Sequence, residues 1–142
     1  METTGYLAPA TTDAAREAYA ELEPIARELV REVAVTMEFD RDAYHEHVTD
    51  DVVATAHDAL FGALLEVHTD DADGFATARE RLHTEVDVSV EGTDHVDHVA
   101  WHHADCADRV VAATYQEERD AAVSTVRRMS WGTVYRELMA DR

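Results

Sequence analysis

Apolar residues recur at helical spacing through the first half of the chain. Residues 1–11 contain a glycine and a proline and are predicted to form an irregular lead-in. A first helix is expected from Thr12 or Asp13 to about Leu22. Pro24 suits the first turn of the next helix, because that position needs no backbone N–H. The next helix carries one apolar stripe with polar flanks, spaced at four residues: Ile25, Leu29, Val33 and Met37.

Three more helices are predicted before residue 83. A short one covers residues 41–47. Thr49 then caps the strongest helical pattern, whose wide apolar face over residues 52–67 is interrupted by only two charged residues. We expect this to be the central and most buried helix. A shorter helix begins after Asp70 or Asp71, each of which can act as its N-cap.

The spacing of apolar residues changes from helical to alternating after residue 83. Val86, Val88 and Val90 alternate with polar residues, which predicts a half-buried strand. A turn at Gly92 separates it from a second strand over residues 96–102. A third strand is predicted over residues 109–115.

The predicted fold is therefore a single α+β domain over residues 1–142. After the lead-in, residues 12–83 form a helical N-terminal half. Residues 84–115 form a three-stranded antiparallel meander, and residues 116–140 form a long C-terminal helix that packs on it.

The charge of the chain is strongly one-sided. Asp and Glu number 31 against 12 basic residues, giving a formal net charge of −19, and all 12 bases are Arg. Charging a sphere of about 19 Å radius to this value costs roughly 14 kcal/mol in 0.1 M salt but only roughly 3 kcal/mol in several molar salt. The excess of acids also disfavours general binding to nucleic-acid phosphates. We therefore predict a cytoplasmic protein of a salt-in halophile.

No stretch of the sequence predicts a membrane or secretory segment. No apolar run approaches 18 residues, and the first residues have neither a basic nor an apolar region. We expect no membrane association.

Nine histidines raise the possibility of a metal site, and five of them lie between residues 83 and 103: His83, His95, His98, His102 and His103. On a strand, His98 and His102 are about 13 Å apart, too far to share one zinc ion. His102 and His103 point to opposite faces. The remaining candidate set is His102 or His103 with Asp105 and Cys106, within residues 95–106. We favour solvated or core-edge histidines over metal ligands and predict no cofactor.

Catalytic motifs are missing from the sequence. Cys106 is the only cysteine and has acidic neighbours, which should raise the pKa of its thiol and weaken it as a nucleophile. The five glycines are too far apart to form a phosphate-binding loop, and no serine lies in a G-x-S-x-G elbow. The sequence therefore favours a protein that is not an enzyme.

One segment departs from the overall charge. Residues 121–136 contain three Arg and no acid. The helix predicted over this segment carries four candidates for a contact surface, because Arg and aromatic residues dominate interface energetics. They are Arg127, Arg128, Trp131 and Tyr135. For Arg127 itself the simpler interpretation, which we favour over the contact surface, is that it pairs with a carboxylate of the helical half while its stem packs on apolar neighbours.

Five stretches of the sequence are similar to a known family. They are Met1–Thr3 with Ala8-Pro9, Asp58–Phe61 with Leu64–Val67, Val99–His102, Val111–Thr114 and Val134–Arg136. On these residues the chain resembles an uncharacterised haloarchaeal family, a domain of unknown function, and the likeness covers nearly the whole chain. The resemblance implies a haloarchaeal protein. It implies no activity, because the family offers no assigned catalytic or binding residues to carry over.

These observations favour a small, non-enzymatic protein–protein interaction or regulatory module, with a protein partner or a second copy of the chain bound through the Arg and aromatic residues of segment 121–136. The alternative is a metal-binding protein or metal-dependent hydrolase that uses the His/Asp/Cys region at residues 95–106. Nucleic-acid binding through Arg127, Arg128 and Arg136 is the least favoured, because counterion release contributes little in molar salt.

Overall fold

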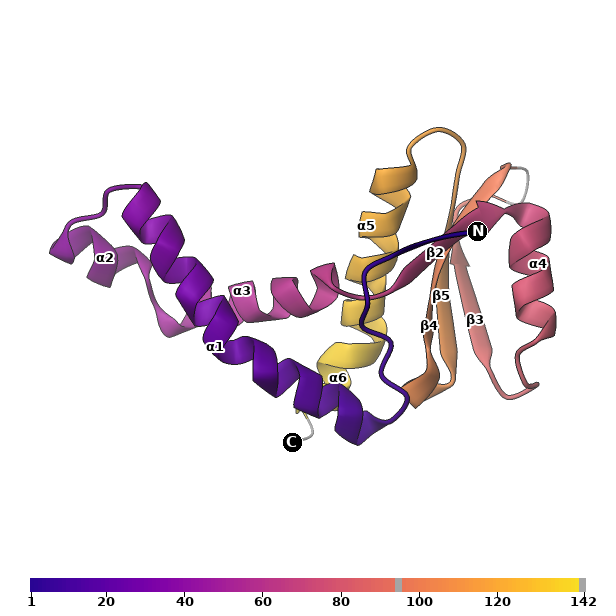
Figure 1. Cartoon of the computed structure of the whole chain (residues 1–142), viewed down its shortest axis with the longest axis horizontal. Coiled ribbons are helices and arrows are strands. Elements are labelled where there is room, and N and C mark those ends of the chain that lie inside the picture. The colour runs from indigo at the N-terminus through magenta and orange to yellow at the C-terminus, as the bar shows by residue number, and fades with distance from the viewer. Residues whose placement is uncertain (94–95, 141–142) are drawn as a thin grey trace.

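The computed structural model describes residues 1–93 and 96–140, and in that part of the chain five strands form one mixed sheet (Figure 1). The strands are β1 (Glu2–Thr4), β2 (Val67–Asp71), β3 (Asp87–Glu91), β4 (His98–Ala104) and β5 (Arg109–Tyr115). Their order across the sheet is β1-β2-β4-β5-β3. Neighbours are antiparallel except β3 and β5, which are parallel.

Helices cover both faces of the sheet. α4 (Ala72–Glu80) packs on β2 and β4 on one side, and α5 (Arg119–Ser130) packs on β4 and β5 on the other. β4 and β5 lie inside the sheet and bury apolar side chains on both of its faces, because successive residues of a strand point to opposite faces. Val99 and Trp101 join the cluster with α4, whereas Ala100 and Ala113 join the cluster with α5.

The C-terminal helical segment is interrupted. α5 leads into a π-helical turn (Trp131–Tyr135) and then α6 (Arg136–Ala140). The predicted helix over 116–140 is thus helical from Arg119, with one wider turn. Trp131, Val134 and Tyr135 of that turn are all buried.

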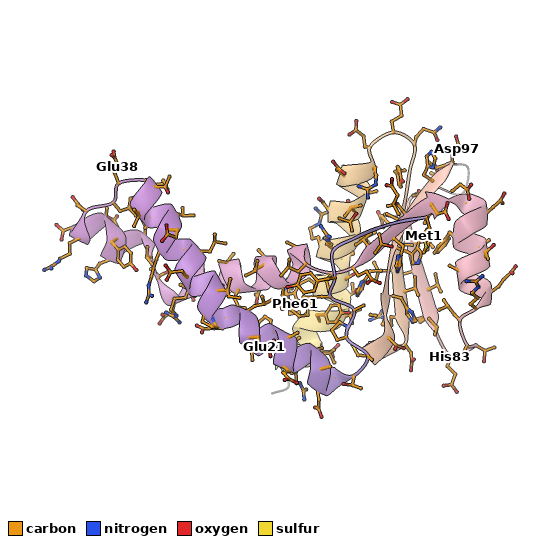
Figure 2. All side chains as sticks on the ribbon, in the orientation of Figure 1. Met1, Glu21, Glu38, Phe61, His83 and Asp97 are labelled. Carbon is orange, nitrogen blue, oxygen red and sulfur yellow. The ribbon has the colours of Figure 1, made fainter. Side chains whose placement is uncertain are left out.

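The N-terminal helices form a projection from this body. α1 (Thr12–Thr36) packs along α3 (Asp50–Ala63), and the short α2 (Arg41–His47) connects their far ends. Figure 1 shows α2 and the adjoining ends of α1 and α3 extending away from the sheet. In Figure 2, Phe61 lies where α3 meets the body and Glu38 lies at the far tip. We call residues 25–56 the helical arm.

The largest core cluster lies at the base of this arm. Phe61 is fully buried there, and its ring lies 5.2–5.8 Å from the rings of Tyr19, Trp131 and Tyr135. Such aromatic packing joins α1 and α3 to the C-terminal helices. No helix in the described residues is both long and apolar enough to cross a membrane.

The predicted apolar stripe of the second helix is exposed on the helical arm. Ile25, Leu29, Val33 and Met37 are between 48% and 60% exposed. The side chains that α1 buries are mostly small: Ala15, Leu22, Ala26 and Ala34.

Three predictions about the N-terminal half are wrong. Residues 2–4 of the predicted irregular lead-in form β1, because their backbone pairs with β2. Pro24 does not begin a new helix but lies within α1, where packing of Leu22 and Ala26 outweighs the lost backbone hydrogen bond. The helical half is also not helical throughout, since the predicted central helix ends at Ala63 and residues 67–71 become β2.

The predicted three-stranded antiparallel meander is also wrong in its topology. All three strands exist close to their predicted positions, but β3 pairs in parallel with β5 at the sheet edge, and β2 takes the place beside β4. Alternation in β3 indicates one half-buried face, and it does not reveal which strand lies beside it. The result is a five-stranded mixed sheet in the described residues.

Candidate functional site

His102 on β4 forms the centre of a buried polar network. Its side chain is fully buried on the α5 side of the sheet. Nδ1 lies 2.7 Å from the backbone oxygen of Glu66, and Nε2 lies 2.6 Å from the hydroxyl oxygen of Tyr135. A carbonyl oxygen can only accept, so Nδ1 carries the proton and donates it. Nε2 of the neutral ring therefore accepts the hydrogen bond that the Tyr135 hydroxyl donates.

Cys106 extends the network on the far side of Tyr135. It lies in the 3-10 turn Asp105–Ala107 that connects β4 to β5, and its thiol hydrogen-bonds the Tyr135 hydroxyl. The network thus connects the residue before β2, β4, the 3-10 turn and the π-helical turn.

Burial keeps all three side chains of this network uncharged near neutral pH. It lowers the pKa of His102 to about 4 and raises the pKa of Tyr135. The pKa of Cys106 is also raised, first by burial and further by the charge of Asp105. The predicted direction for Cys106 is confirmed, although burial is the larger cause. A neutral thiol is a poor nucleophile, so the geometry fits a structural role.

The proposed metal ligands are held apart by the strand. His102 faces α5, and both of its ring nitrogens are engaged. His103 lines the opposite side of the sheet, under α4, as strand alternation predicts. Within residues 1–93 and 96–140, no three His, Cys, Asp or Glu side chains are grouped as a metal would require. His95 lies outside the described residues, and the prediction of no cofactor stays a prediction.

The predicted contact residues divide between core and surface. Trp131 and Tyr135 are buried, with 9% and 0% exposure, whereas Arg127 is half-buried and Arg128 is exposed. Arg127, Arg128 and Trp131 line a cleft of about 340 Å³ between α3 and α5, together with Asp58. Tyr135 does not line this cleft and belongs to the His102 network. The interaction prediction stays a prediction, and its accessible residues are the two Arg.

Arg127 binds backbone in place of a carboxylate. Its Nε donates to the backbone oxygen of Leu65 at 3.1 Å. Among the described residues no carboxylate forms an ion pair with it. Burial, followed by the charge of Arg119, lowers the pKa of its guanidinium. The alternative in which Arg127 pairs with the helical half through a carboxylate is therefore wrong in its partner, because the carbonyl of Leu65 takes that place.

Two features of the structure were not predicted from the sequence. The stripe of the helical arm was visible, but its exposure depends on how far α1 extends beyond the body. A pocket between α4 and the sheet brings together Arg79, His68 and His103. Alternation in β4 places His103 on the same face as Trp101, which is the one signal that pointed to this pocket.

Comparison with curated proteins and with solved structures finds no significant match. A comparison with protein families does find one. The model of the family of unknown function DUF5809 matches residues 6–136, from the lead-in to the start of α6. The match includes every element except β1 and most of α6. The chain therefore belongs to the family of unknown function DUF5809.

Proposed function

We propose that this protein is a non-enzymatic protein–protein interaction module and that its contact surface is the helical arm. The observation that carries the proposal is the exposed stripe of Ile25, Leu29, Val33 and Met37. Four residues at this spacing extend over about 18 Å of helix. Val35 and Val52 add exposed apolar surface to the same arm. A continuous apolar row of this kind is typical of a helix that docks into a groove of a partner.

The charges around the stripe indicate the chemistry of the partner. Residues 21–56 contain ten acidic and three basic residues, a net charge of −7. Arg27 and Arg31 already pair with Glu23 and Glu28, so they leave the acidic excess uncompensated. We infer an apolar groove with a basic rim on the partner. A second copy of the arm would bring the same acids and, with Arg27 and Arg31 already paired, no free base beside its stripe, so the heteromeric partner is favoured.

Helical geometry places acids beside the stripe. Glu32 lies three residues after Leu29, and Glu21 lies four residues before Ile25, so each borders the apolar row. Among the described residues neither of these two acids forms an ion pair. They are the groups that a basic rim would meet.

The test compares the partner proteins that bind to the wild type with those that bind to the double variant Ile25→Gln/Leu29→Gln. Both side chains are exposed, so the double variant should fold like the wild type. Val90→Gln on β3 is the matched control, because it exchanges an exposed apolar residue on the other side of the molecule. We expect a stoichiometric partner that wild type and Val90→Gln retain, and that the double variant binds at least tenfold more weakly in a titration of the purified proteins.

Three results would contradict the proposal. The partner could bind the double variant as tightly as the wild type, which would put the contact elsewhere. The wild type could assemble only with itself, which would make a second copy the occupant. It could also remain without any partner at all salt concentrations, which would remove the interaction function.

We also propose that the protein works in the cytoplasm of a halophile. The net charge of −19 and the complete use of Arg in place of Lys support this proposal. Arg pairs with carboxylates in a fixed bidentate geometry, and concentrated salt screens the remaining repulsion. The metal-binding alternative gains no such support from the described residues, because His102 and His103 face opposite sides of the sheet.

A further inference from the structure

A pocket of about 220 Å³ lies between α4 and the sheet, on the face opposite α5. Its polar lining comes from Arg79 and Arg81 at the end of α4, His68 on β2 and His103 on β4. Phe75 and Trp101 supply aromatic lining, with ring centroids 5.1 Å apart. Figure 1 shows how α4 lies along this side of the sheet. The pocket is separate from the helical arm and from the cleft beside Arg127.

The lining of this pocket carries positive charge and no acid. None of its lining residues is Asp or Glu, although acids outnumber bases 31 to 12 in the whole chain. In the described part of the chain, neither Arg79 nor Arg81 forms an ion pair. The guanidinium of Arg79 lies 5.8 Å from the ring centroid of Phe75 and so remains close to the aromatic surface. Two uncompensated cations in one concavity favour an anionic ligand.

One histidine of the pocket lining has a buried ring nitrogen without a hydrogen-bond partner among the described residues. Nε2 of His103 is buried and makes no hydrogen bond to the described residues. A buried polar atom of this kind costs about 1–3 kcal/mol unless a ligand or water satisfies it. His68, by contrast, is already held by Glu66 Oε1 at 3.1 Å and by the Thr3 hydroxyl at 2.9 Å. The groups open to a ligand are therefore the two Arg, with His103, whose Nε2 is buried, in the lining beside them.

The size and lining of the pocket limit the ligand. A volume of 220 Å³ corresponds to about seven water molecules at liquid density, which is below the range of drug-sized ligands. The aromatic side chains favour a flat or apolar body, and the cations favour a negatively charged end. We propose that this pocket binds a small aromatic carboxylate, with its ring against Phe75 and Trp101 and its carboxylate toward Arg79 and Arg81.

The experiment uses benzoate as the probe, on the full chain at a salt concentration where it is folded. Binding is followed by NMR through the indole signal of Trp101. We expect benzoate to shift this signal in a saturable manner and Arg79→Gln/Arg81→Gln to raise the dissociation constant at least tenfold. Arg128→Gln is the matched control, because it removes a cation from the separate α3–α5 cleft. Its dissociation constant should equal that of the wild type.

Two further probes separate the charge from the ring. Benzamide keeps the ring without the negative charge, and acetate keeps the charge without the ring. Each should bind at least tenfold more weakly than benzoate. The proposal is overturned if benzamide or acetate binds as tightly as benzoate, if benzoate does not bind, or if Arg128→Gln weakens binding as much as the double variant does. None of these outcomes bears on the helical arm, so the two proposals fail independently.

Discussion

Acidification should destabilise this fold through one buried imidazole, His102. In the folded state burial lowers the pKa of His102 to about 4, whereas an exposed histidine has a pKa of 6.5. Between these two values the unfolded chain binds a proton at His102 and the folded chain does not. The contribution of His102 to the free energy of unfolding is therefore fully present above pH 6.5, and it is lost progressively as the pH falls toward 4.

The difference between the two pKa values sets the size of the effect. About 2.5 pKa units correspond to about 3 kcal/mol over the whole window. Between pH 7 and pH 4.5 the loss should be about 2 to 3 kcal/mol. This is a large part of the total stability of a typical domain, which is about 5–15 kcal/mol. The side chain is fully buried, so solvent provides no screening that would reduce the effect.

The assay is urea unfolding followed by circular dichroism at pH 7 and pH 4.5. It is performed in 3 M KCl, so that the changing charge of the acidic surface contributes little. His102→Gln removes the titrating ring and should lose about 2 to 3 kcal/mol less than the wild type between the two pH values. His45→Gln is the matched control, because it removes an imidazole that is exposed on α2.

An equal loss of stability in the wild type and in His102→Gln would show that His102 does not cause the pH dependence. If His102→Gln does not fold, an NMR titration of the His102 ring in the wild type gives the answer directly. A pKa near 4 supports the buried network, and a pKa at or above 6.5 contradicts it.

Three further predictions concern the stability of the fold. Tyr135→Phe should lower the free energy of unfolding by about 1–3 kcal/mol, because it leaves Nε2 of His102 buried without a partner; denaturation beside the exposed control Tyr6→Phe measures this, and equal stability would argue against the bond. Gly5→Ala should lower the midpoint of thermal unfolding, because Gly5 has a φ of +85° and a Cβ would collide with the backbone oxygen of Leu65; an unchanged midpoint would count against it. Dialysis from 3 M to 0.05 M KCl should remove the far-ultraviolet circular dichroism signal, and a spectrum that does not change would contradict the charge argument.

The central strands could be predicted from sequence because they carry their own signal. β5 has the predicted bounds, and β4 starts and ends two residues later than predicted. Valine-rich alternation also located β3, but only its backbone partners could reveal that it pairs with β5. β1 and β2 are short and polar, and their pairing with each other and with β4 makes them strands. No local pattern within residues 2–4 or 67–71 contains that information.

The candidate sites were predictable only where strand alternation decides the direction of a side chain. Alternation correctly separated His102 from His103. It could not reveal that His102 meets Tyr135 from a helix 33 residues later, because that contact depends on the π-helical turn. The exposure of Leu29 was equally hidden, since an apolar stripe looks the same whether it packs on the core of its own chain or on a partner.

We propose above that the exposed stripe of the helical arm contacts a partner protein. The most direct measurement places a photo-crosslinking amino acid at Leu29 in cells and, as the control, at Val90, two exposed apolar positions on opposite parts of the molecule. We expect a single protein that is crosslinked from Leu29 and absent from Val90. No crosslink from Leu29, or the same crosslinks from both positions, would contradict it.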